Sequence, residues 1–124
     1  MARTATASGP TATYELGTNE VTLVGRLAGA ATEITLPSGD LLSNFRVVVP
    51  RREGTPRRGA KVDTIDCVAT TAPIRRFVGR RAAGDALMVV GSLHRRFFRS
   101  AGAVASRYEV RATRVTRVTL DDSE

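Results

Sequence analysis

The strongest chemical signal in the sequence is a run in which arginines flank two aromatic residues, Arg95-Arg96-Phe97-Phe98-Arg99. A guanidinium group binds phosphate oxygens through two parallel N–H donors, and an aromatic ring offers a flat face on which a nucleobase stacks. Basic and aromatic side chains interleaved in this way are typical of a surface that binds single-stranded nucleic acid. We therefore predict that this run contacts an unpaired polynucleotide.

A second basic segment, residues 51–60, follows the predicted strand Leu41–Val49. It contains four arginines and one glutamate.

Neighbouring residues of a strand point to opposite faces, so at most one of Phe97 and Phe98 lies in a core. We predict that Phe98 stacks on bases, whereas core, interface and stacking roles all remain open for Tyr108. The complete predicted interface is Arg46, Arg51, Arg52, Arg57, Arg58, Arg95, Arg96, Phe97, Phe98, Arg99 and Tyr108.

The charge of the chain agrees with an acidic polymer as partner. Among 124 residues, 19 basic side chains outnumber 12 acidic ones, which gives a formal net charge of +7. This charge creates a positive potential that attracts nucleic acid or an anionic surface. All the basic residues except Lys61 are arginines, a bias that genome nucleotide composition also produces.

Residue counts argue against a disulfide framework, a zinc site and a catalytic centre. The chain has one cysteine, Cys67, and one histidine, His94, which are too few for an internal disulfide or a four-ligand zinc site. Both lie in predicted strands with no third group to orient them as a catalytic pair. Asp63 and Asp66 are three residues apart in a strand, so they face opposite sides and do not share a metal. We predict no catalytic residue, no metal site and no cofactor, and therefore a protein that is not an enzyme.

Membrane insertion and export are not expected. No apolar run approaches the roughly 20 residues that span a bilayer. The segment Met1–Thr6 has no hydrophobic stretch after its charge, unlike a signal peptide. We predict a cytoplasmic, nucleoid-associated protein, and the free thiol of Cys67 fits that reducing compartment.

Apolar residues alternate with polar ones along most of the chain, which indicates half-buried strands. The glycines at 25 and 91 interrupt two of these strands and indicate sharp bends. In the last strand the apolar phase shifts at Val115, which predicts a bulge. The predicted strands are Asn19–Leu27, Glu33–Leu36, Leu41–Val49, Val62–Thr70, Ala86–Phe98 and Arg107–Thr119.

One helix is predicted between the third and fourth long strands. Thr71 is its expected N-cap, and Gly84 is expected to end it in a left-handed conformation. The phases of Phe45 and Phe77 predict that both rings are in the core. The segment Arg99–Ser106 is predicted to be the loop of a hairpin.

This order of elements predicts an all-β protein with an OB-fold, a five-stranded Greek-key barrel with one short helix between strands three and four. The pattern by itself leaves other small barrels open. The predicted organisation is a flexible arm over residues 1–17, a single-stranded DNA-binding domain over 18–119, and a short acidic tail over 120–124.

Four motifs resemble those of bacterial single-stranded DNA-binding proteins, and they occur in the same order. They are Asn19–Leu27, Pro37-Ser38-Gly39 before Phe45–Val49, Gly84–Leu93, and Gly102 followed by Tyr108–Ala112. The resemblance covers about residues 18–118. It implies an OB-fold that binds single-stranded DNA without strict sequence preference, protects it in replication, recombination, repair or segregation, and assembles as a homotetramer. A homotetramer is therefore the favoured assembly, and a dimer is the alternative.

The chain also departs from that family. It has no tryptophan, and positions that carry aromatic residues in the family fall near Thr64, Thr70 and Pro50 or Arg51. The sequence shows no long tail with an acidic tip, so recruitment of replication proteins through such a tail is not expected. The resemblance is therefore to a tail-less, aromatic-poor paralogue. The alternatives are a primosome-type or RNA-binding OB protein, or a protein–protein adaptor built on an OB barrel.

Overall fold

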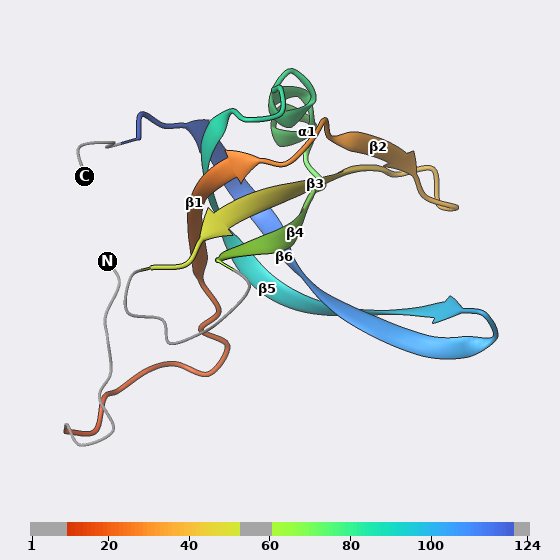
Figure 1. Cartoon of the computed structure of the whole chain (residues 1–124). Helices are drawn as coiled ribbons and strands as arrows, with labels where there is room; N and C mark the ends of the chain where they lie inside the picture. The colour runs from red at the N-terminus through yellow and green to blue at the C-terminus, as the bar shows by residue number, and fades with distance from the viewer. Residues whose placement is uncertain (1–9, 53–60, 121–124) are drawn as a thin grey trace.

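The computed structural model describes residues 10–52 and 61–120. Within these ranges the chain forms one helix and six strands (Figure 1). In chain order they are β1 (Val21–Leu27), β2 (Thr32–Thr35), β3 (Leu41–Pro50), β4 (Val62–Ala69), α1 (Ala72–Gly79), β5 (Ala86–Ser100) and β6 (Ala103–Arg117). Residues 1–9 of the predicted arm and 121–124 of the predicted tail lie outside the described residues, as do Arg57 and Arg58.

Five of the strands close into a barrel. The sheet order is β1-β5-β6-β4-β3-β2, and an additional pairing of β1 with β3 completes the ring. All the pairings are antiparallel except the short one between β4 and β6. The short strand β2 pairs only with β3, and α1 connects β4 to β5. This arrangement confirms the predicted OB-fold.

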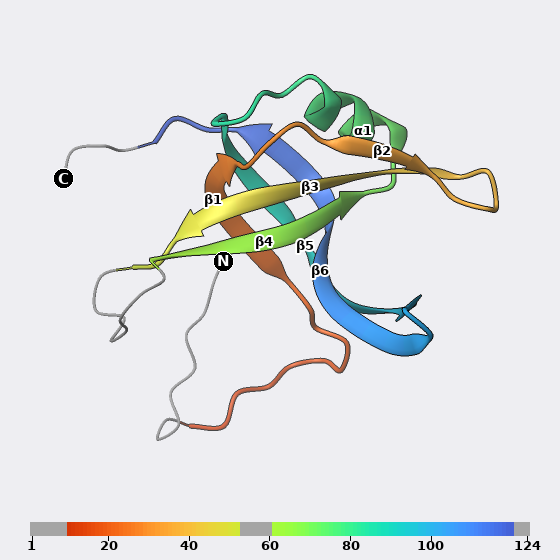
Figure 2. The same cartoon turned by 45° about the vertical axis from the view of Figure 1, so that its right-hand side comes forward.

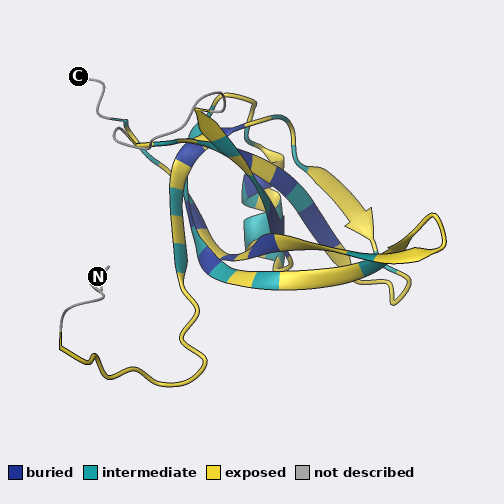
Figure 3. Ribbon diagram, turned by 60° about the horizontal axis from the view of Figure 1, so that its bottom comes forward, coloured by how far each residue is buried: buried dark blue, intermediate teal, exposed yellow. Residues whose placement is uncertain are grey.

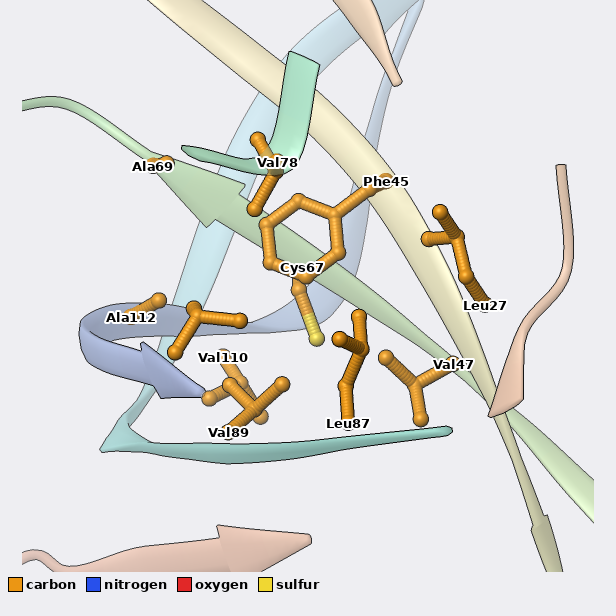
Figure 4. Packing of buried hydrophobic residues seen from close by; sticks show 11 residues of the cluster. Leu27, Phe45, Val47, Cys67, Ala69, Val78, Leu87, Val89, Val110 and Ala112 are labelled. Carbon is orange, nitrogen blue, oxygen red and sulfur yellow. The ribbon is translucent and has the colours of Figure 1, made fainter. Parts of the chain in front are cut away.

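The core follows from the period of two along the barrel strands. Phe45, Leu87, Val89 and Val110 are buried, while most of the residues between them are not (Figure 3). Val78 of α1 is fully buried and points toward the Phe45 ring, so the helix closes one end of the barrel (Figure 4). The predicted core position of Phe45 is confirmed, and Phe77 packs against the core as a partly buried side chain.

The predicted helix is too long at its C-terminal end. Its expected start is confirmed, because Thr71 is the N-cap in extended conformation, although the threonine hydroxyl makes no capping hydrogen bond. The helix ends at Gly79, not near Gly84. Gly84 does have a left-handed φ of +93°, but it belongs to a separate turn in which Asp85 accepts a hydrogen bond from the Ala82 N–H. Glycine costs about 1 kcal/mol in a helix relative to alanine, which favours the earlier end.

The predicted hairpin loop is also too long. β5 and β6 stay paired until Ser100 faces Ala103, so only Ala101 and Gly102 form the turn. Both have positive φ values, +52° and +81°, as a two-residue hairpin turn matched to the strand twist requires. Because these strands are paired so far along, the hairpin projects well beyond the barrel.

Two predicted irregularities position the strands. The register of β5 and β6 shifts next to Gly91, which confirms the bulge expected from the apolar phase shift in β6. At Gly25, β1 turns so close to β3 that a side chain would overlap the Val48 carbonyl oxygen and stand 2.9 Å from Val47 Cγ1. Barrel closure between β1 and β3 therefore requires glycine at position 25.

The helix and the hairpin lie toward different ends of the barrel, as the turned view shows (Figure 2). Residues 10–20 are exposed and form no strand. No helix of the described chain is long and apolar enough to cross a membrane.

The close approach at Gly25 generates a stability prediction. Replacement of Gly25 by Ala is expected to lower the free energy of unfolding by at least about 2 kcal/mol, because the new methyl group is forced against the β3 backbone. Gly29→Ala is the matched control, since a Cβ there meets nothing within 4 Å. Urea unfolding of both variants measures the difference, and equal midpoints would show that β1 and β3 do not need this contact.

Candidate nucleic-acid interface

The β5–β6 hairpin presents two faces, because its strands are paired residue by residue and their side chains alternate. Asn19 fixes the base of the hairpin, since its side-chain amide binds both the N–H and the carbonyl oxygen of Leu93, at 2.9 and 2.8 Å. We call the two faces the groove face and the back face. The groove face carries His94, Arg96, Phe98, Arg107 and Glu109; the back face carries Leu93, Arg95, Phe97, Arg99, Val104 and Tyr108.

A groove of about 450 Å³ lies between the groove face and the barrel strands β3 and β4. One wall is the segment 28–30, whose residues are alanine and glycine and leave room for a ligand. Phe45 and Cys67 also contribute to the lining. The charged lining residues are Arg46, Arg96, Arg107, Asp66 and Glu109.

The arginines of the groove are held by its carboxylates. Arg46 Nε donates to Asp66 Oδ1 at 2.9 Å, and Arg107 Nη1 lies 3.7 Å from Asp66 Oδ2. Arg96 Nε lies 3.9 Å from Glu109 Oε1. Three positive and two negative charges leave a formal excess of +1 in the groove (3 − 2). The Arg46 side chain is 61% exposed, and an exposed pair of this kind contributes only about 0–1 kcal/mol, so phosphate can compete for the guanidinium.

Phe98 is the aromatic residue of the groove face, and two of the groove arginines lie near its ring. The guanidinium carbons of Arg107 and Arg96 lie 5.2 and 5.9 Å from the centre of its ring. The ring is half-buried, and both arginines line the groove. The Phe98 ring thus lies beside two cationic groups of the groove.

The back face carries a second aromatic cluster. Phe97 and Tyr108 are 61% and 58% exposed, and the guanidinium of Arg95 lies against both rings, 4.9 and 5.7 Å from their centres. Leu93 and Val104 are exposed on the same face. Arg99 is paired with Val104 and therefore shares this face. The predicted interface residues in the hairpin are consequently divided between two faces.

The remaining predicted arginine segment begins at the far end of β3. Arg51 forms a two-pronged contact with Asp63, with its Nη2 2.9 Å from Oδ1 and its Nε 3.2 Å from Oδ2. Hydrogen bonds from this guanidinium lower the pKa of the Asp63 carboxyl below its ordinary value. Arg51 follows Arg46 by five residues along β3, a separation of about 16 Å. Arg52 comes next along the chain and is exposed.

The interface predicted from the sequence lacks three charged residues of the groove, Asp66, Arg107 and Glu109. Asp66 and Asp63 do face opposite sides, as predicted, but each one binds an arginine. Arg107 faces Arg96, and Glu109 faces His94. A two-residue turn at 101–102 would have implied both pairings, so the overestimated loop length concealed them.

The cysteine and the histidine do not form a pair. The Cys67 thiol contacts the Ile65 carbonyl oxygen at 3.8 Å, and His94 Nε2 lies 2.8 Å from Ser92 Oγ. Burial, together with the negative charges of Asp66 and Glu109, raises the pKa of the Cys67 thiol to about 12. The negative charges of Asp66 and Glu109 therefore both reach Cys67, which lines the groove.

Comparisons with known proteins agree with the fold. The model of the family described as the single-strand binding protein family matches residues 18–118. A structure of the single-strand binding protein of Plasmodium falciparum in complex with single-stranded DNA is 20% identical, with a TM-score of 0.67 over 88% of this chain and 100% of that one. A small single-stranded DNA-binding protein from Streptomyces coelicolor is 19% identical, with a TM-score of 0.60 over 80% and 93% of the two chains. No curated protein matches the sequence.

The environment of Cys67 predicts an unreactive thiol. With a pKa of about 12, almost none of the thiol is ionised at pH 8, and the thiolate is the reactive form. We expect the native protein to react with a disulfide reagent such as dithionitrobenzoate at least about 100-fold more slowly than the protein unfolded in guanidinium chloride. Similar rates in the two states would show that Cys67 is neither buried nor surrounded by negative charge.

Proposed function

Because the chain belongs to the single-strand binding protein family, we propose that it binds single-stranded DNA in the groove between the β5–β6 hairpin and the strands β3 and β4. The observation that carries this proposal is the position of Phe98, beside Arg96 and Arg107 at the edge of a groove lined by both arginines. The proposed activity is binding, without a catalytic step or cofactor.

Binding proceeds by exchange of anions. Phosphate groups of the strand replace Asp66 at Arg46 and Arg107, and the counterions condensed on the DNA are released, so affinity falls as salt rises. One base stacks on Phe98, which contributes about 1–3 kcal/mol and tolerates any base because every base has a π-face. Contacts to the backbone and to one ring therefore support binding with little sequence preference.

The other predicted residues extend this path. Arg51 and Arg52, with Arg57 and Arg58, continue the positive charge at the end of β3 and in the segment that follows it. In the proposed complex they hold phosphates that have left the groove. At Arg51 a phosphate would compete with the two-pronged contact to Asp63, whose side chain is 47% exposed.

We assign the back face to assembly. Leu93, Phe97, Val104 and Tyr108 are exposed apolar or aromatic side chains gathered on one side of the hairpin. A contiguous patch of this kind favours a protein interface, and a homotetramer would bury it between copies, with a dimer as the smaller assembly. Arg95, which lies between the two rings, and Arg99 would then border the interface.

The cellular role follows from the ligand. A protein that coats unpaired DNA protects it during replication, recombination, repair or segregation. We place it in the cytoplasm at the nucleoid, where single strands arise.

Removal of the Phe98 ring tests the proposed site. We expect Phe98→Leu to weaken binding to a single-stranded 12-mer by about tenfold, because stacking is lost while an apolar side chain is kept. Fluorescence anisotropy of a labelled oligonucleotide measures the change.

The matched control is Phe97→Leu, which removes the neighbouring ring on the back face. Its effect on affinity is expected to stay within about twofold. A larger loss for Phe97→Leu than for Phe98→Leu would contradict the groove as the site. Preferential binding of structured RNA over the DNA strand would favour the RNA-binding alternative.

A further inference from the structure

The groove contains a carboxylate, Glu109, that forms an ion pair with Arg96 at 3.9 Å but accepts no hydrogen bond from it. Resting on the proposed function, we propose that Glu109 accepts a hydrogen bond from the exocyclic amino group of a nucleobase. Strands of cytosine would then bind more tightly than strands of uracil or thymine. The protein would thus read base chemistry at one position of an otherwise sequence-tolerant groove.

Glu109 is buried but lacks a hydrogen-bond donor. Its side chain is only 10% exposed, and its ion-pair partner Arg96 is 3.9 Å away, beyond hydrogen-bonding distance. In residues 10–52 and 61–120 no other group donates to this carboxylate. No buried side-chain oxygen of the described residues lacks a partner, so a Glu109 oxygen that accepts no hydrogen bond from the protein is open to the groove. Since Glu109 lines the groove, a ligand in the groove can supply the missing donor.

The second groove carboxylate does not have this property. Asp66 accepts a 2.9 Å hydrogen bond from Arg46 through one oxygen and lies 3.7 Å from Arg107 through the other. Both of its oxygens therefore have cationic partners within the protein. Glu109 is the acceptor that remains available to a base.

A carboxylate discriminates between bases because it only accepts hydrogen bonds. It repels phosphate and carbonyl oxygens but binds an amino group, and acidic side chains in nucleic-acid complexes accept from cytosine N4. Uracil and thymine carry no amino group, and their N3–H lies between two carbonyl oxygens that repel the carboxylate. Arg96, beside Glu109, can donate to the ring nitrogen or carbonyl oxygen of the same cytosine.

Glu109 and Phe98 would contact different bases of one strand. Glu109 is paired with His94, four residues before Phe98 along β5, which separates the two side chains by about 13 Å. Stacking at Phe98 stays insensitive to base identity, while Glu109 selects at a neighbouring position. The other ionisable side chains of the groove face are His94, Arg96 and Arg107. The two arginines can only donate hydrogen bonds.

The test compares oligonucleotides of matched length and charge. Twelve-residue strands of deoxycytidine, deoxyuridine and N4,N4-dimethyldeoxycytidine are titrated at pH 8, a length within the roughly 4–16 nucleotides that one OB barrel covers. We expect the full chain to bind the cytosine strand about fivefold or more tightly than the uracil strand. The dimethylated strand, which has no N4–H donor, should lose that advantage.

Glu109→Gln should reduce the preference for cytosine to within about twofold and should raise affinity for the uracil strand, because a negative charge leaves the groove. Glu20→Gln removes the same charge from an exposed position before β1 and should keep the preference. A merely structural role for Glu109 predicts a different result, in which Glu109→Gln weakens binding to both strands equally.

Equal affinity of the unchanged protein for cytosine and uracil strands would overturn the proposed base reading and leave single-strand binding intact. Retention of the preference by the dimethylated strand or by Glu109→Gln would also overturn it. Failure to bind any of the three strands would overturn the proposed function itself.

Discussion

The balance between three arginines and two carboxylates determines what the groove can do. Arg46 and Arg107 share Asp66, and Arg96 lies near Glu109. These ion pairs keep the guanidinium groups oriented on the groove before a ligand arrives. The exposed pair of Arg46 with Asp66 is weak enough for phosphate to compete with it. A groove lined by arginines alone would be more attractive to any anion. The carboxylates reduce that general attraction, and Glu109 adds a hydrogen-bond acceptor that we propose a base amino group uses.

The barrel supplies the geometry of this balance. β3 and β4 present Arg46 and Asp66 side by side as register partners, and β5 and β6 do the same for Arg96 and Arg107. The two pairs come together because β4 and β6 meet in a short parallel pairing beside Cys67. The close approach of β1 to β3 and the tight turn at the hairpin tip are the backbone conditions for this arrangement. Although the chain has few aromatic residues, this arrangement places the Phe98 ring near the guanidinium groups of Arg96 and Arg107.

Much of the fold could be predicted from the sequence, because burial on one face of each strand imposes a period of two. The alternation around Phe45 and the shift at Val115 identified the core face and the bulge. The turn at Ala101 could not be predicted in this way, since a non-glycine residue at positive φ is uncommon and the sequence around it looks like a longer loop. Because the turn was predicted to be a longer loop, the pairing of Arg96 with Arg107 and of His94 with Glu109 could not be predicted. Adjacency did predict that Phe97 and Phe98 separate, but only the register shows which face borders the groove.

We propose that single-stranded DNA occupies this groove. The most direct measurement is a map of backbone amide chemical-shift changes in the full chain on addition of a single-stranded 12-mer. We expect the largest changes to cluster at Arg46, Asp66, Arg96, Phe98 and Arg107. Changes concentrated on Arg76 of α1 and on Arg80 at its C-cap, with the groove residues unaffected, would contradict this binding site.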